Sequence, residues 1–142
     1  MTESYCTFHL ADLYLGIEVS KVHEVLRYQR MTRVPLVPPV VRGLMNLRGQ
    51  IVTALDLRQR FGLPAADTEQ QPLNVVVRSR EGAVSLLVDR ISDVIETVPQ
   101  DFERAPETLR GVLRDFIRGA YKLKGQLLLI LDTDRVIDAS PQ

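Results

Sequence analysis

The pattern of apolar and polar positions predicts β-strands along most of the chain. Between residues 13 and 19, Leu13, Leu15, Ile17 and Val19 alternate with other residues. Alternation with a period of two is typical of a strand with one buried face.

Segment 86–98 fits two periodicities, because some of its apolar residues also fall near helical spacing, namely Leu87, Ile91, Val94, Ile95 and Val98. Two Val and two Ile among them favour a strand, since β-branched side chains pack well on a pleated surface. We predict a strand, a bend at Asp89–Arg90 and a second strand.

Two hairpins are predicted where a basic residue and a glycine separate apolar runs, at Arg48–Gly49 and at Lys124–Gly125. Glycine supplies the positive φ that a tight turn requires. The strands that follow, 51–55 (IVTAL) and 127–131 (LLLIL), are apolar at nearly every position. Both faces of each must be covered, as in a small coiled barrel packed against another unit.

The chain repeats itself. NLRGQIVTALDL (46–57) resembles KLKGQLLLILDT (122–133), and IEVSKVHEVL (17–26) resembles LLVDRISDVI (86–95) in the same order. This indicates a tandem repeat of about 70 residues, with a first unit over 1–70 and a second over 71–142. The boundary is approximate, and strands could be exchanged between the units.

Short segments between the strands carry their own signals. Asp56 and Asp132 are predicted to cap single helical turns. VPLVPP (34–39) is predicted to be an extended, rigid spacer, with a docking groove as the alternative. The boundary between units falls at 63–72, and 99–111 should be a surface loop or short irregular helix.

Charge argues for a protein partner. The 18 basic and 18 acidic residues of this 142-residue chain cancel, so no global field favours nucleic acid or an anionic membrane. Segment 27–60 holds seven Arg and one acid, Asp56. Few aromatic residues accompany these Arg, so a protein surface bearing carboxylates fits better than RNA or single-stranded DNA.

The sequence contains few residues of the kinds that act in catalysis. Cys6, His9 and His23 are the only thiol and imidazole residues, and their spacing predicts neither a metal site nor a cofactor. Asp89, Asp93 and Glu96 are interpreted as a solvated face, not as a general acid and base. We therefore expect a binding protein and not an enzyme. The lone Cys fits a reducing cytoplasm, and neither a signal peptide nor a run of transmembrane length is evident.

Taken together, these motifs resemble the CheW family of bacterial chemotaxis coupling proteins. The most specific segment is VVRGLMNLRGQIVTALDLRQRFGL (40–63), with an N-L-R-G turn, a D-L-R and an R-F-G-L; the resemblance extends over about residues 5–138. It implies an all-β fold of two packed five-stranded SH3-like β-barrels with short helical turns, together one CheW-like domain. It also implies no enzymatic activity.

The resemblance implies two sets of site residues. The receptor-facing set comprises Val22, Glu24, Gly43, Asn46, Arg48 and Gly49, in which Gly43, Asn46 and Gly49 would shape the turn that carries Arg48. The kinase-binding set comprises Val25, Phe102, Glu103, Arg104, Glu107, Thr108 and Leu109, with Arg104 standing where the family pattern has a Pro. The alternative for Arg48 is an exposed turn residue that only aids solubility.

The function implied is that of an adaptor in the cytoplasm, associated with membrane-bound chemoreceptor arrays but not inserted in the membrane. It would join the regulatory domain of the histidine kinase CheA to the cytoplasmic tips of methyl-accepting chemotaxis proteins. The same role in a non-flagellar pathway that controls pili, biofilm or second messengers is an alternative. A small-barrel nucleic-acid-binding protein is an alternative of a different class.

Overall fold

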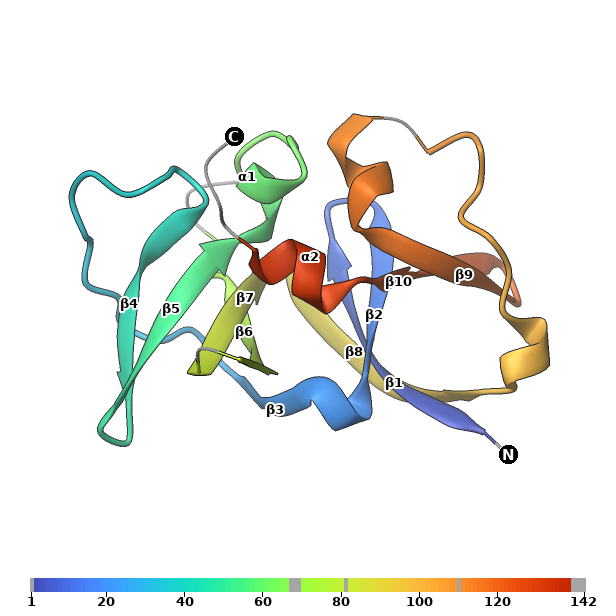
Figure 1. Ribbon diagram of the computed structural model, residues 1–142, viewed down its shortest axis with the longest axis horizontal. Helices are drawn as coiled ribbons and strands as arrows, with labels where there is room; N and C mark the ends of the chain where they lie inside the picture. Colours follow the sequence, from blue (N-terminus) through green and yellow to red (C-terminus); the bar gives the residue numbers. More distant parts are fainter. Residues whose placement is uncertain (1, 67–69, 81, 110, 139–142) are drawn as a thin grey trace.

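Ten strands form two five-stranded sheets within residues 2–66, 70–80, 82–109 and 111–138, the part of the chain that the computed structural model describes (Figure 1). Sheet A contains, in spatial order, β8 (Arg90–Thr97), β1 (Glu3–Leu10), β2 (Leu13–Glu18), β10 (Gln126–Leu131) and β9 (Ile117–Leu123). Sheet B contains, in spatial order, β3 (Val22–Leu26), β6 (Leu73–Ser79), β7 (Gly82–Val88), β5 (Gln50–Asp56) and β4 (Val41–Leu47).

Short helices connect or follow the strands: α1 (Leu57–Arg60), α2 (Thr133–Ile137) and the 3₁₀ turns η1 (Val19–Lys21), η2 (Pro99–Asp101) and η3 (Gly111–Phe116). In Figure 1, α2 lies at the front between the two sheets. None of the described helices is long and apolar enough to cross a membrane.

The two sheets have the same plan. Each has a central antiparallel hairpin, β1–β2 or β6–β7, whose second strand pairs in parallel with β10 or β5. Antiparallel β9 or β4 follows on one side, and β8 or β3 forms the other edge. The predicted all-β fold, two packed five-stranded SH3-like β-barrels with short helical turns, is therefore confirmed.

Strands are exchanged reciprocally between the two halves of the chain. The N-terminal hairpin β1–β2 joins sheet A, whose other strands are β8, β9 and β10. The hairpin β6–β7 of the second half joins sheet B with β3, β4 and β5. Each sheet therefore takes strands from both 1–70 and 71–142, so neither five-stranded sheet is built from one of these halves alone.

The main core contains residues from both sheets. Phe8 and Ile17 of sheet A belong to one buried cluster with Val75 and Leu86 of sheet B, and all four are at most 1% exposed. A second cluster comprises Tyr5, Tyr14, Tyr121, Leu128 and Ile130, all contributed by strands of sheet A. Apolar residues are therefore buried both between the sheets and within one barrel, which explains the nearly continuous apolar run of β10.

Several local predictions are confirmed. The Asp56 side chain accepts a hydrogen bond from the Gln59 N–H at 3.3 Å, and Asp132 accepts one from the Arg135 N–H at 3.3 Å, so both are N-caps. Strand β7 ends at Val88 and β8 begins at Arg90, so segment 86–98 is two strands with a bend. Turns occupy both basic–glycine pairs.

The prediction of an extended spacer at 34–39 is wrong. A turn forms at Pro35–Leu36, and Leu36 has a φ of 62°. Proline fixes only its own φ and restricts the residue before it, so the conformation of Leu36 after Pro35 was left open.

Candidate functional site

The β4–β5 turn has a left-handed backbone at both central residues. Arg48 has a φ of 51° and Gly49 a φ of 87°, which is the sign pattern of a type I′ hairpin turn. The Asn46 side-chain oxygen accepts a hydrogen bond from the Gly49 N–H at 2.8 Å. In the repeated turn, Gly125 is left-handed with a φ of 78° but Lys124 is not. The two copies of the repeated phrase therefore build different turns.

Arg48 forms an ion pair with Glu24 on β3. Its Nη2 donates to both carboxylate oxygens of Glu24, and the two side chains are 67% and 23% exposed. Strands β3 and β4 are the two edges of sheet B, so this pair bridges the edges and requires the sheet to curl into a barrel. No ion pair joins Asp93 and Lys124, which hold the equivalent positions of the repeat and are both described.

The structure thus brings together four residues of the predicted receptor-facing set: Glu24, Asn46, Arg48 and Gly49. A pocket of about 230 Å³ lies beside them and is lined in part by His23, Glu24, Leu47 and Arg48. Val22 begins β3 and packs partly buried against the main core.

Gly43 does not shape the turn. A Cβ at Gly43 would lie 2.7 Å from the backbone oxygen of Thr32, because Thr32 and Leu44 exchange two backbone hydrogen bonds of 2.8 Å. The expectation that Gly43 shapes the turn of Arg48 is therefore wrong. Its missing side chain lets segment 31–32 cross β4.

Gly119 on β9 of sheet A holds the position that Gly43 holds on β4 of sheet B. A Cβ there would lie 2.6 Å from the backbone oxygen of Glu103 and 2.2 Å from the Phe102 ring. Glu103 and Ala120 exchange two backbone hydrogen bonds of 2.9 Å. The segments after β3 and after β8 thus occupy equivalent positions against β4 and β9.

The predicted kinase-binding segment, Phe102 to Leu109, lies along β9. The Phe102 ring is 38% exposed and meets the Tyr121 ring edge-on at 5.3 Å between centroids. Glu103 faces Lys122 at 3.7 Å, Arg104, Glu107 and Thr108 are exposed, and Leu109 packs partly buried against the main core. Val25 is 39% exposed on β3 of sheet B, so it is not part of this surface.

A sequence model of the CheW-like domain matches residues 4–140. The chain belongs to the CheW family. It is 33% identical over 136 residues to the chemotaxis protein CheW of Bacillus subtilis, covering 96% of this chain and 87% of the relative. The scaffolding protein TtCheW from Thermoanaerobacter tengcongensis superposes with a TM-score of 0.88 at 25% identity, covering 100% of this chain and 97% of that one.

A more distant similarity is to Protein PilI of Pseudomonas aeruginosa. It is 25% identical over 114 residues, covering 80% of this CheW-like chain and 64% of PilI.

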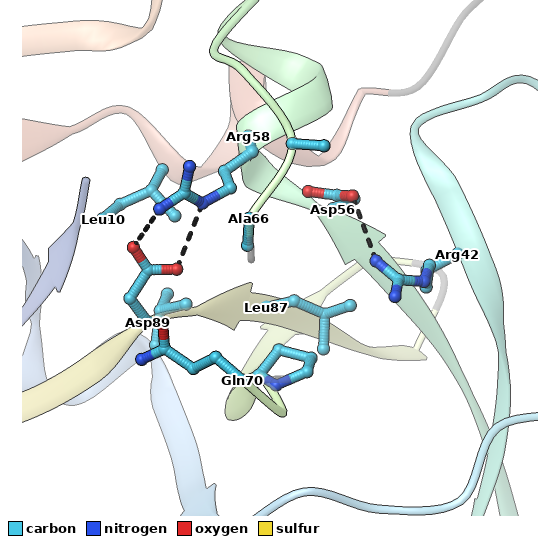
Figure 2. A pocket seen from close by; sticks show the side chains of 11 residues that line it. Leu10, Arg42, Asp56, Arg58, Ala66, Gln70, Leu87 and Asp89 are labelled. Carbon is cyan, nitrogen blue, oxygen red and sulfur yellow. Dashed lines mark hydrogen bonds and ion pairs between the residues drawn. The ribbon is translucent and has the colours of Figure 1, made fainter. Parts of the chain in front are cut away.

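An ion-pair junction that the sequence did not predict lies at the D-L-R motif, between Arg58 and Asp89. Figure 2 shows Arg58 of α1 facing Asp89 with two hydrogen bonds, Nε to Oδ1 at 3.2 Å and Nη2 to Oδ2 at 2.6 Å. The Asp89 carboxylate also accepts from the Ala11 N–H in the β1–β2 turn at 2.7 Å. Both side chains are at most 17% exposed, so the interpretation of Asp89 as part of a solvated face is wrong.

Burial alone would raise the pKa of the Asp89 carboxyl. The hydrogen bonds from Arg58 and from the Ala11 N–H outweigh burial and hold that pKa below its usual value. The junction joins α1, the β7–β8 bend and the β1–β2 turn, which come from three parts of the sequence. Of these contacts, the sequence predicted only the bend of the chain at Asp89.

The side chains of His9 and Cys6, which were considered for chemistry, are packed among neighbouring residues of the fold. The His9 ring stacks on Tyr14 at 4.9 Å between centroids, and burial, with the nearby Arg90 charge, lowers the pKa of His9. Burial raises the pKa of the Cys6 thiol. Across the described residues, no cluster of three or more His, Cys, Asp or Glu could hold a metal ion.

Proposed function

We propose that this protein is a non-enzymatic adaptor of chemotaxis signal transduction that couples the histidine kinase CheA to methyl-accepting chemoreceptors. Membership of the CheW family over residues 4–140 supports this function. The adaptor would lie in the cytoplasm at chemoreceptor arrays. One surface would bind the cytoplasmic tip of a receptor and another the regulatory domain of CheA.

The Arg48–Glu24 ion pair is the observation that supports the receptor surface best. Glu24 engages only Nη2 of Arg48, so the Nε and Nη1 donors of a largely exposed guanidinium are without a partner among the described residues. Such donors can bind a carboxylate or a free carbonyl at a helix C-terminus. Because Glu24 already restricts the Arg48 side chain, binding a partner costs less conformational entropy.

The kinase surface is proposed at Phe102–Leu109. Phe102 is partly exposed, and its ring packs edge-on against the ring of Tyr121. This contact restricts the Phe102 side chain before a partner binds. Rigid aromatic side chains surrounded by polar groups are typical centres of protein interfaces. Val25, on the other sheet, would contribute to a second contact with a CheW-like regulatory domain.

Reconstitution tests the adaptor function. Purified CheA and a receptor signalling fragment are mixed with and without this protein, and autophosphorylation of the kinase is measured. Receptor control of the kinase should depend on the protein. Equal receptor control in its absence would contradict the proposal.

The similarity to PilI supports a second candidate, the same coupling role in a chemosensory pathway that controls pili, biofilm or second messengers. Deletion of the gene distinguishes the two outputs. Loss of swimming chemotaxis with normal surface motility supports the first candidate, and the reverse supports the second.

A further inference from the structure

Helix α1 continues directly from the hairpin that carries Arg48. Strand β5 follows the Arg48 turn and ends at Asp56, immediately before α1. Within sheet B, β5 lies between β4 and β7 and pairs with both. Leu57 of α1 and Phe61, the residue after α1, are buried in the main core. A strand that is hydrogen-bonded on both sides therefore joins the hairpin to α1, with no loop between them.

The proposed kinase surface, Phe102–Leu109, is held by the 3₁₀ turn η3. We call 102–109 the kinase segment. Nη1 of Arg114 on η3 donates to three backbone oxygens of this segment, those of Pro106, Glu107 and Leu109, at 3.4, 3.4 and 3.3 Å. Turn η3 ends at Phe116, directly before β9. The position of η3 therefore sets the position of the second part of the kinase segment.

Arg60 of α1 contacts both η3 and α2. Its guanidinium carbon lies 5.1 Å from the centroid of the Phe116 ring, a cation–π contact, and the Phe61 ring lies 5.5 Å from the same ring. Nη2 of Arg60 donates to the backbone oxygen of Arg135 at 3.2 Å and to that of Asp138. In Figure 1, α1, α2 and the orange helical turn before β9 gather at the upper centre. We call these contacts the Arg60 cluster.

The same two helices hold buried polar atoms that make no hydrogen bond. Among the described residues, the buried side-chain nitrogen and oxygen atoms without a partner are Nε of Arg60 on α1 and Oγ1 of Thr133 on α2. A buried donor without an acceptor costs free energy. Any shift of α1 against η3 or α2 that brings an acceptor to Nε recovers part of that cost. This favours a second arrangement of the fold at the Arg60 cluster.

We propose that Arg60 is a positioning residue that couples the receptor-facing hairpin to the kinase segment. Binding at Arg48 shifts β5 and α1, Arg60 and the Phe116 ring move together, and η3 shifts the kinase segment. Arg60 belongs to neither binding surface, so it acts only through these contacts. The proposal rests on the adaptor function, because it takes both surfaces from it. Coupling between two binding sites is reciprocal, so the kinase domain affects receptor affinity by the same factor.

Calorimetric titration measures the coupling. The full chain is titrated with the CheA regulatory domain, with and without a saturating receptor signalling fragment. For the wild type, the fragment should change the affinity for the CheA domain by at least about fivefold. For Arg60→Ala, the change should fall below about twofold, while the affinity for each partner alone stays close to that of the wild type. A residue that only stabilises the fold would not separate these quantities.

A second variant and a matched control make the test specific. Phe116→Leu keeps an apolar side chain but removes the ring that Arg60 covers, so it should also abolish the coupling. Arg78→Ala is the control. Arg78 also donates to the backbone of a distant segment, the Ser20 oxygen at 3.1 Å, but it lies on β6 outside the Arg60 cluster. Arg78→Ala should keep the coupling of the wild type. Amide hydrogen exchange of β4 and β5 checks that each variant is folded.

The possible results separate this proposal from the adaptor function. If either partner fails to bind the wild type, the adaptor function is contradicted and the role of Arg60 falls with it. If both partners bind without affecting each other, or if the coupling persists in Arg60→Ala and Phe116→Leu, only the role of Arg60 is overturned. Loss of coupling in Arg78→Ala, or weaker binding of each partner alone to Arg60→Ala, would likewise overturn that role and leave a structural one.

Discussion

Arg48 at the tip of the β4–β5 hairpin and Glu24 on β3 form an ion pair across the two edges of sheet B. The residues are far apart in sheet order and meet only because the sheet curls. The equivalent residues of the second repeat, Lys124 and Asp93, form no such pair. This difference distinguishes the two copies of an otherwise repeated hairpin.

Arg48→Glu should abolish most receptor association while the protein stays folded. Arg48 is 67% exposed, so loss of its ion pair with Glu24 should lower the free energy of unfolding by only about 1 kcal/mol. Chemical denaturation and binding to a receptor signalling fragment are measured on the same sample. Lys124→Glu, at the matched turn, should leave receptor binding intact. Unfolding of Arg48→Glu would instead indicate a structural role.

Gly43→Ala and Gly119→Ala should each destabilise the fold by about 1–3 kcal/mol, because the new Cβ meets a backbone oxygen that cannot rotate away. The distances are 2.7 Å to Thr32 O and 2.6 Å to Glu103 O. Urea denaturation measures the loss. Gly16→Ala is the matched control, since its Cβ would meet only side-chain ends at 3.2 Å. A Gly16 variant as unstable as the other two would refute this explanation.

Asp89→Asn should destabilise the protein by about 2 kcal/mol near neutral pH, because it removes charge-assisted hydrogen bonds at a mostly buried site. The folded state lowers the pKa of Asp89, so its stabilisation is present above the ordinary carboxyl pKa of about 4 and is lost as pH falls through the lowered value. The difference in unfolding free energy between wild type and variant should therefore shrink below about pH 4. A difference independent of pH would exclude ionised Asp89 as the cause.

Phe102→Ala should weaken binding to the CheA regulatory domain by about tenfold or more, in line with loss of an aromatic anchor at an interface. Calorimetric titration measures the affinity, and receptor binding should not change. Val112→Ala removes another exposed apolar side chain, 48% exposed and outside the segment, and serves as the control. Equal losses for the two variants would contradict a specific role for Phe102.

Local elements were predictable because their signals lie in short stretches of sequence. The Asp56 and Asp132 caps, the two glycine turns and the bend at Asp89 each depend on a few neighbouring residues. The motifs of 40–63 were sufficient to predict the family, which the match over residues 4–140 confirms. The prediction of an extended spacer at 34–39 was wrong because the φ of Leu36 is not restricted by the prolines around it.

The sequence by itself determined the strands, their repetition and the family, since periodicity, turn residues and motifs are properties of neighbouring positions. Only the tertiary structure decided which hairpin joins which sheet. It also placed Thr32 against Gly43, and it brought Arg48 to Glu24 and Arg58 to Asp89. These relationships depend on sheet curvature and on chain crossings between distant segments. No local pattern encodes such long-range distances, so only the folded chain reveals them.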